Sequence, residues 1–159
     1  MFTVKTELNS EVQTELSRPV YITSLIMLII GSVGLVAYIV LGTIFDNTAL
    51  DYMLAFAVPF GFGLVFLITV KKMSKNIEKI KQTNEYTFEQ DYMSVTTYRF
   101  EENEGSIKVY YRDLVKSRET EKYIFMYINK VSALAVDKTL LTEDELIILK
   151  SLLGLKIKK

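Results

Sequence analysis

The chain has 159 residues, with 19 Lys and Arg, 19 Asp and Glu, and no His, Cys or Trp. Without His and Cys it cannot form a Ser-His-Asp triad, a Cys-His pair, a zinc finger, a cysteine-ligated iron–sulfur cluster or a disulfide. The charges are unevenly spread, because all but five of the acidic residues and all but two of the basic residues follow residue 70. An apolar region therefore precedes a polar domain.

Residues 1–18 form an N-terminal segment ahead of the first apolar run. Over residues 2–7, apolar and polar side chains alternate, which predicts a β-strand able to form the edge of a sheet. Ser10 and Gln13 are of the types that cap a helix, so a helix entered at Glu11 is also predicted. Two readings stay open: residues 2–7 pair with a C-terminal sheet, or they form an unpaired tail.

Residues 19–70 have the pattern of a two-helix transmembrane hairpin. Residues 19–45 are 27 uncharged residues and residues 52–70 are 19, whereas a bilayer core about 30 Å thick needs roughly 20 helical residues. Only Asp46 to Asp51 connect the two runs, which predicts antiparallel neighbouring helices. A buried core helix or a signal peptide would explain one such run, but two in a short chain favour the membrane hairpin.

Small residues in both predicted spans allow helix backbones to approach closely. They are Gly31 and Gly34 in the first span and Ala57 and Gly61 in the second. These residues favour packing within the hairpin, and an interface between copies of the chain is the alternative. Neither span contains a charged residue, which disfavours an ion pathway or a proton relay.

A basic segment, residues 71–83, follows the second span and is predicted to continue it as a helix. Lys71, Lys72, Lys75 and Lys79 lie here, whereas the connection between the spans has no Lys or Arg. Because Lys and Arg stay on the cytoplasmic side, both termini are predicted to be cytoplasmic. The same four lysines are candidates for binding anionic lipid headgroups, and the alternative is that they only determine the topology.

Residues 84–159 form the predicted cytoplasmic domain, in which alternation of period 2 replaces the helical pattern. We expect turns at residues 89–91 and 101–105, the second with Gly105 in a left-handed conformation. Residues 122–129 are apolar on both faces, which predicts a central strand. The predicted strands are residues 86–88, 92–100, 106–111, 114–120 (a strand or a loop), 122–129 and 131–136.

One amphipathic helix closes the predicted domain. Thr142 and Glu145 have the spacing of a capping box at its start, and Gly154 is expected near its end. The expected fold class is a membrane α-helical hairpin plus an α+β cytoplasmic domain, with an antiparallel sheet closed by one C-terminal helix in a pleckstrin-homology-like arrangement. The apolar face of that helix is predicted at Leu146, Leu149, Leu152 and Leu153.

In order and spacing, several segments of the chain resemble the YcxB-like membrane proteins. After the N-terminal segment, the two-span hairpin and the basic exit, they are residues 86–89, 107–114, 123–129 and 136–145. The family often has Pro before the lysine of the closing strand, where this chain has Asp137. The resemblance implies a multi-pass protein of a bacterial cell membrane with a pleckstrin-homology-like cytoplasmic domain. It implies no catalytic residue.

The motifs of several enzyme classes are missing from the sequence. It has no Gly-rich phosphate loop, no nucleophile elbow and no calcium-loop spacing of Asp residues. The excess of positive charge after residue 70 comes mostly from the juxtamembrane lysines, so no nucleic-acid surface is predicted. We therefore expect no enzyme activity, no cofactor and no metal.

The sequence favours a binding protein held at the cytoplasmic face of a membrane. The expected partners are the lipid bilayer and either another protein or further copies of the chain. One alternative is a regulatory or immunity-type membrane protein that acts through its transmembrane helices on another membrane protein, and another is a membrane enzyme that uses carboxylates or Ser and Lys side chains. The ligand, the oligomeric state and the biological pathway do not follow from the sequence.

Overall fold

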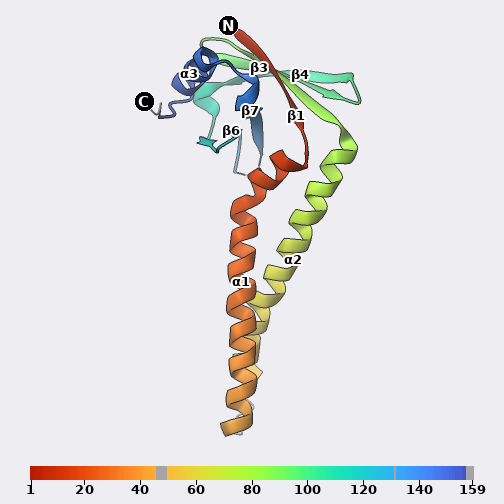
Figure 1. Cartoon of the computed structure of the whole chain (residues 1–159), viewed down its shortest axis with the longest axis vertical. Coiled ribbons are helices and arrows are strands. Elements are labelled where there is room, and N and C mark those ends of the chain that lie inside the picture. Colours follow the sequence, from red (N-terminus) through yellow and green to blue (C-terminus); the bar gives the residue numbers. More distant parts are fainter. Residues whose placement is uncertain (46–49, 131, 157–159) are drawn as a thin grey trace. The chain divides into compact units, whose positions relative to one another are not determined.

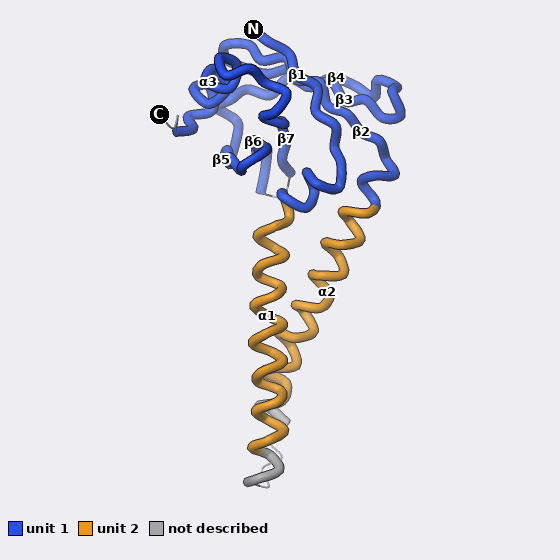
Figure 2. The backbone as a smooth tube through the Cα atoms, viewed as in Figure 1, with its two compact units in different colours: residues 1–15, 76–159 blue, residues 16–75 orange. Residues whose placement is uncertain are grey.

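The computed structural model describes residues 1–45, 50–130 and 132–156. The chain divides into two compact units (Figure 2): residues 16–75 form a helical unit, and residues 1–15 together with 76–159 form a sheet unit. The sheet unit is thus assembled from the two ends of the chain.

Two long helices make up the helical unit and extend beyond it. Helix α1 (Ser10–Phe45) includes Pro19, and helix α2 (Leu50–Ile80) includes Pro59. Both are long and apolar enough to cross a membrane, and only 17% and 11% of their most apolar windows are buried within the chain. A core helix of a water-soluble protein would be mostly buried, so these two helices suggest a membrane protein.

The helix bounds differ from the predicted spans at three points. Helix α1 begins nine residues before Pro19, and α2 continues ten residues past Val70, so the basic segment is helical as predicted. Asp51, expected in the connection, belongs to α2. Asp46 and the rest of residues 46–49 lie outside the described residues.

Asn9 caps helix α1. Its side-chain Oδ1 accepts a hydrogen bond from the backbone N–H of Val12 at 3.0 Å, and its carbonyl accepts one from Gln13 at 3.2 Å. The predicted cap at Ser10 is therefore wrong by one residue. The physical reason is that the chain already leaves its strand at Leu8, so the first non-helical residue with a capping side chain is Asn9.

Four antiparallel strands form the first sheet in the order β1-β2-β3-β4 (Figure 1). The strands are β1 (Phe2–Leu8), β2 (Gln82–Phe88), β3 (Tyr92–Arg99) and β4 (Glu102–Tyr110). Strand β1 pairs with β2 along its whole length, from Phe2 opposite Phe88 to Leu8 opposite Gln82. Residues 2–7 are therefore an edge strand of this sheet and not an unpaired tail.

Three shorter strands form a second sheet in the order β5-β6-β7. They are β5 (Lys116–Glu119), β6 (Tyr123–Tyr127) and β7 (Ala133–Asp137). Strand β6 is central and all five of its residues are buried, as predicted for residues 122–129. Val131, the first residue of the predicted last strand, lies outside the described residues.

The single sheet expected from the sequence is in fact divided in two. A 3₁₀ turn, η1 (Tyr111–Asp113), separates β4 from β5. Because this turn redirects the chain, β5 pairs with β6 and not with β4. A second 3₁₀ turn, η2 (Lys138–Leu140), follows β7.

The turn between β3 and β4 is shorter than the predicted one. Its two central residues are Phe100 and Glu101, with φ of 50° and 70°, and β4 already begins at Glu102. Gly105 lies inside β4 with φ of 150°, beside a register shift in the β3–β4 pairing. Glycine is therefore needed here for a β-bulge and not for the turn.

Helix α3 (Glu143–Leu152) closes the chain as predicted. The Thr142 hydroxyl accepts from the Glu145 backbone N–H, and the Glu145 carboxylate accepts from the Thr142 backbone N–H, which completes the capping box. At the other end Gly154 has φ of 64°, and the Leu155 N–H donates to the Lys150 carbonyl. This is the glycine C-cap expected at the helix end.

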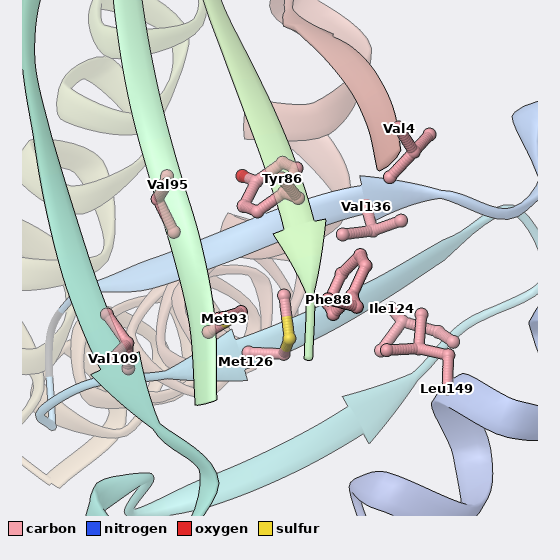
Figure 3. Close-up of a cluster of buried hydrophobic side chains, with 10 residues drawn as sticks. All are labelled: Val4, Tyr86, Phe88, Met93, Val95, Val109, Ile124, Met126, Val136 and Leu149. Atoms are coloured by element: carbon pink, nitrogen blue, oxygen red, sulfur yellow. The ribbon is translucent and has the colours of Figure 1, made fainter. Parts of the chain in front are cut away.

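The two sheets and α3 share one hydrophobic core (Figure 3). Leu149 of α3 is fully buried in it, and Leu146 and Leu153 pack against it. The buried cluster is Val4, Tyr86, Phe88, Met93, Val95, Val109, Ile124, Met126, Val136 and Leu149. A strand that precedes the apolar helices in the sequence and strands that follow them thus contribute to the same core.

Candidate membrane and lipid-binding site

Close contact between α1 and α2 depends on two glycines of α1. A Cβ added at Gly31 would lie 2.7 Å from both the Cβ and the backbone N of Phe60. A Cβ added at Gly34 would overlap the ring of Phe56. Both glycines are buried within the helical unit, so any larger side chain would push the helices apart.

The contact on α2 involves Gly63 and not the predicted Gly61. A Cβ added at Gly63 would lie 2.8 Å from the carbonyl of Ser24, which is fully buried. Gly61 has no atom within 4 Å of such a Cβ and is exposed, while Ala57 is half-buried. Residues two apart on a helix point to different faces, so Gly61 takes no part in the packing between the described parts of α1 and α2.

The four candidate lipid-binding lysines all lie on the last turns of α2. Lys71, Lys72, Lys75 and Lys79 are exposed. With a rise of 1.5 Å per residue they follow Val70 by about 1.5, 3, 7.5 and 13.5 Å along the helix axis. The headgroup region of a leaflet is about 5–7 Å deep. If Val70 stood at the edge of a bilayer core, Lys71 and Lys72 would be nearest to the headgroups, Lys75 would lie at their outer limit, and Lys79 would be the farthest.

The predicted basic helical segment of residues 71–83 ends earlier than expected. Helix α2 stops at Ile80, Lys81 adopts φ of 45°, and β2 begins at Gln82. The chain thus passes from helix to sheet through a single residue. The basic segment is therefore the last part of α2, in agreement with the prediction that it continues the second span.

The first turns of α1 are bound to the second sheet. Lys122 Nζ and the Tyr123 hydroxyl both donate to the Glu11 carboxylate, at 2.6 and 3.1 Å. Arg118 donates to the backbone carbonyl of Glu15 at 2.9 Å. Val12, between them, is 3% exposed. The helix that enters the apolar region therefore begins as an integral part of the sheet unit.

A second group of charges fixes α3 to the second sheet. Lys138 and Lys150 both donate to one carboxylate oxygen of Glu119, at 2.9 and 2.8 Å. Burial alone would raise the pKa of Glu119, but the hydrogen bonds from Lys150 and Lys138 outweigh it and lower that pKa. The two lysine side chains are only 11% and 16% exposed, so this arrangement is structural. Within the described ranges, no group of three acidic side chains is placed to hold a metal ion.

Sequence reasoning missed the residues that join distant parts of the chain. Glu11 and Lys122 are 111 positions apart, and a single sequence gives no signal for such a pair. Asn9 was detectable, because Asn is among the best N-capping residues. Gly63 was detectable only as one small residue among several, since the sequence does not say which face of α2 meets α1.

The comparisons with known proteins concern the sheet unit. The family model described as YcxB-like protein matches residues 94–153. The match begins in β3 and ends just after α3, so it includes neither β1 and β2 nor the apolar helices. The searches of curated proteins and of solved structures returned no match. The C-terminal part of this chain, residues 94–153, is therefore a YcxB-like domain.

Proposed function

We propose that this protein is anchored in a bacterial cell membrane by two spans and presents its YcxB-like domain at the cytoplasmic face. The domain acts in binding and not in catalysis. Its partners are anionic lipid, another protein, or further copies of the chain. The described part of the sheet unit has seven antiparallel strands and, after the last of them, one closing helix, which supports the pleckstrin-homology-like part of this proposal.

The pairing of β1 with β2 is the observation that carries the proposal. Strand β1 precedes both apolar helices and β2 follows them, yet their backbones are hydrogen-bonded in register over seven residues. Both ends of the helical segment must therefore lie on the same side of any membrane. An even number of crossings satisfies this requirement, and α1 and α2 supply two.

The distribution of charge supports the cytoplasmic side. Lys71, Lys72 and Lys75 follow the second span, whereas the segment between the spans contains Asp46 and Asp51 and no basic residue. Lys and Arg near the ends of spans are retained in the cytoplasm. The sheet unit, with both termini, would then face the cytoplasm.

Single-cysteine labelling tests this topology directly, because the chain has no cysteine of its own. Ser106→Cys places a thiol on an exposed residue of β4, and Asn47→Cys places one between the spans. In intact cells, a membrane-impermeant maleimide should label the Asn47 variant and not the Ser106 variant. Permeabilised cells should label both. Labelling of the Ser106 variant in intact cells would overturn the proposed orientation.

A second candidate function follows from the open side of α2. Gly61 is exposed, and a Cβ added there would meet no atom of the described residues within 4 Å. A small residue facing lipid allows another helix to approach closely, so we also propose a regulatory role through the spans. Gly61→Leu should then abolish association with the partner membrane protein or with a second copy. Retention of binding by this variant would leave the domain as the interacting part.

A further inference from the structure

Three strained backbone positions surround one depression on the sheet unit. Among the described residues, the non-glycine residues with positive φ are Lys81, Phe100 and Glu101, at 45°, 50° and 70°. All three line a single open depression of about 610 Å³. Its other lining residues are Lys5, Glu7, Thr83 and Tyr98.

The two-residue turn between β3 and β4 explains the positive φ angles of Phe100 and Glu101, but it does not explain why Phe and Glu occupy these positions. A two-residue connection between antiparallel strands favours positive φ at both central positions, and Asn-Gly suits it best. Phe in this conformation is a genuine outlier that costs free energy. Phe100 regains little by packing, because it is 59% exposed. An aromatic and an acidic side chain are thus displayed at the depression at a cost to stability.

The floor of the depression is one row of outward-facing residues across three strands. Glu7 of β1 is in register with Thr83 of β2, and Thr83 with Tyr98 of β3. Phe100 and Glu101 stand at the end of this row, where the Phe100 N–H donates to the Lys81 carbonyl at 3.3 Å. Two carboxylates and two aromatic rings therefore surround Thr83.

The charges of the depression favour a cation. Lys5 is already neutralised, because its Nζ lies 3.4 Å from the Glu85 carboxylate. The same Nζ lies 5.5 Å from the centroid of the Tyr98 ring, so this ring already holds one cation of the chain. With Lys5 and Glu85 paired, Glu7 and Glu101 exceed Lys81 by one negative charge. Aromatic faces beside carboxylates are the usual surroundings of a bound ammonium or guanidinium group.

The position of the depression indicates where such a cation comes from. In the last register row, Leu8 lies opposite Gln82, and Gln82 opposite Arg99. This row is the end of the sheet at which α1 begins and α2 stops. If both helices cross a bilayer, this end is covalently tied to the cytoplasmic membrane surface. Other membrane proteins concentrate Lys and Arg in the same layer.

We propose that this depression binds a Lys or Arg side chain from the juxtamembrane segment of another membrane-spanning chain. The ammonium or guanidinium group lies between Glu7 and the Tyr98 and Phe100 rings, with Glu101 at the rim. The identity of the partner rests on the proposed membrane anchoring, whereas the cation site itself rests only on the sheet unit.

The test uses the full chain in nanodiscs of uncharged lipid. The probe is a fluorescent peptide with the sequence of residues 71–81, a representative basic juxtamembrane segment, and its control has every Lys replaced by Gln. Fluorescence polarisation should show binding of the basic peptide only. The double variant Phe100→Asn with Glu101→Gly and the single variant Glu7→Gln should each bind about tenfold more weakly.

Stability separates lost recognition from lost folding. The Asn-Gly turn should raise the unfolding temperature while it weakens binding, because it removes the strain together with the aromatic and acidic groups. Glu143→Gln and Ile147→Asn, on exposed positions of α3, serve as matched controls and should bind as the parent chain does. Glu7→Gln, a polar replacement at an exposed position, keeps the test valid if the turn variant does not fold.

Three results would overturn the inference. They are failure of the parent chain to bind the basic peptide, binding of the peptide by Glu7→Gln and the turn variant as tightly as by the parent chain, and binding of inositol hexakisphosphate in place of the peptide. The maleimide experiment is run on the same chain. If its labelling pattern is as expected and the peptide does not bind, only the cation site fails. If the pattern is reversed, the membrane proposal fails as well.

Discussion

The hydroxyl of Thr6 accepts a hydrogen bond from the backbone N–H of Asp137 at 3.2 Å, although the two residues are 131 positions apart. Thr6 is 1% exposed. Strand β1 is hydrogen-bonded to β2 along its length, and Thr6 joins it to the end of β7 in the other sheet. Strand β1 therefore links the two sheets through hydrogen bonds.

Substitutions on the two faces of β1 should differ in how much they destabilise the sheet unit. Val4→Asp places a charge in the core, where Val4 is 5% exposed, and should destabilise the sheet unit by about 3 kcal/mol or more. Thr3→Asp changes the exposed face and should stay within about 0.5 kcal/mol of the parent. Urea unfolding in detergent micelles, followed by tyrosine fluorescence and pulse proteolysis, measures both. Equal stability of the two variants would mean that β1 is not part of the core.

Glu119 should make the stability of the sheet unit depend on acid pH. Its pKa is lowered on folding from an ordinary value of 4.5, so its contribution is complete above that value and is lost as pH falls through the folded pKa. Glu119→Gln should cost about 2 kcal/mol at pH 7, because two charged hydrogen bonds are weakened. The variant should also lose less stability than the parent between pH 5 and acid unfolding. A parallel decline of both proteins would rule out this carboxylate as the cause.

Glycine substitutions should distinguish packing within the hairpin from contacts outside it. Gly31→Leu should separate α1 from α2, because the new side chain meets the backbone of Phe60. Gly61→Leu should leave the hairpin intact, since Gly61 faces open space. Thermal unfolding in micelles reports the first effect, and crosslinking in native membranes reports any loss of oligomers. The hairpin assignment would be wrong if Gly61→Leu lowered the unfolding temperature as much as Gly31→Leu.

The lysines of α2 should differ in their attraction for anionic lipid. Lys75 follows Val70 by about 7.5 Å of helix and Lys79 by about 13.5 Å, so in a membrane-anchored chain Lys75 would be the nearer of the two to the headgroups. Lys75→Gln should remove about 1 kcal/mol of attraction, and Lys79→Gln should remove less. Energy transfer from a dye on Asn76→Cys to labelled phosphatidylglycerol in nanodiscs measures the enrichment, which should fall as salt rises. Equal effects of the two substitutions would argue against direct headgroup contact.

Local signals in the sequence were sufficient wherever one segment determines its own structure. The capping box at Thr142 and Glu145 depends on four consecutive residues, and the apolar run of β6 identifies a strand buried on both faces. The two uncharged runs likewise indicate the apolar helices. In each case the physical requirement is met within one element, so spacing alone reveals it.

Prediction from the sequence was less successful where the structural role of a residue depends on contacts with residues far away in the sequence. Gly105 was assigned to a turn because glycine is common there, but the pairing of β4 with β3 requires it at a bulge. Gly61 and Gly63 are both glycines of the second span, so the sequence does not distinguish them. The structure shows that Gly63 is the one that packs against α1. Whether residues 2–7 form a strand depended on β2, which lies 80 positions away.

The place of β1 in the sheet unit has a consequence for biosynthesis. A ribosome makes β1 before both apolar helices and makes its partners β2 and β7 after them, so the strand must wait until these helices have been synthesised. In a chain whose helices cross a bilayer, a helix inserted in the wrong orientation would leave β1 on the far side of the membrane. The domain would then expose the core around Val4 and Thr6 to cellular proteases. In such a chain, completion of the sheet would therefore depend on correct insertion of both helices.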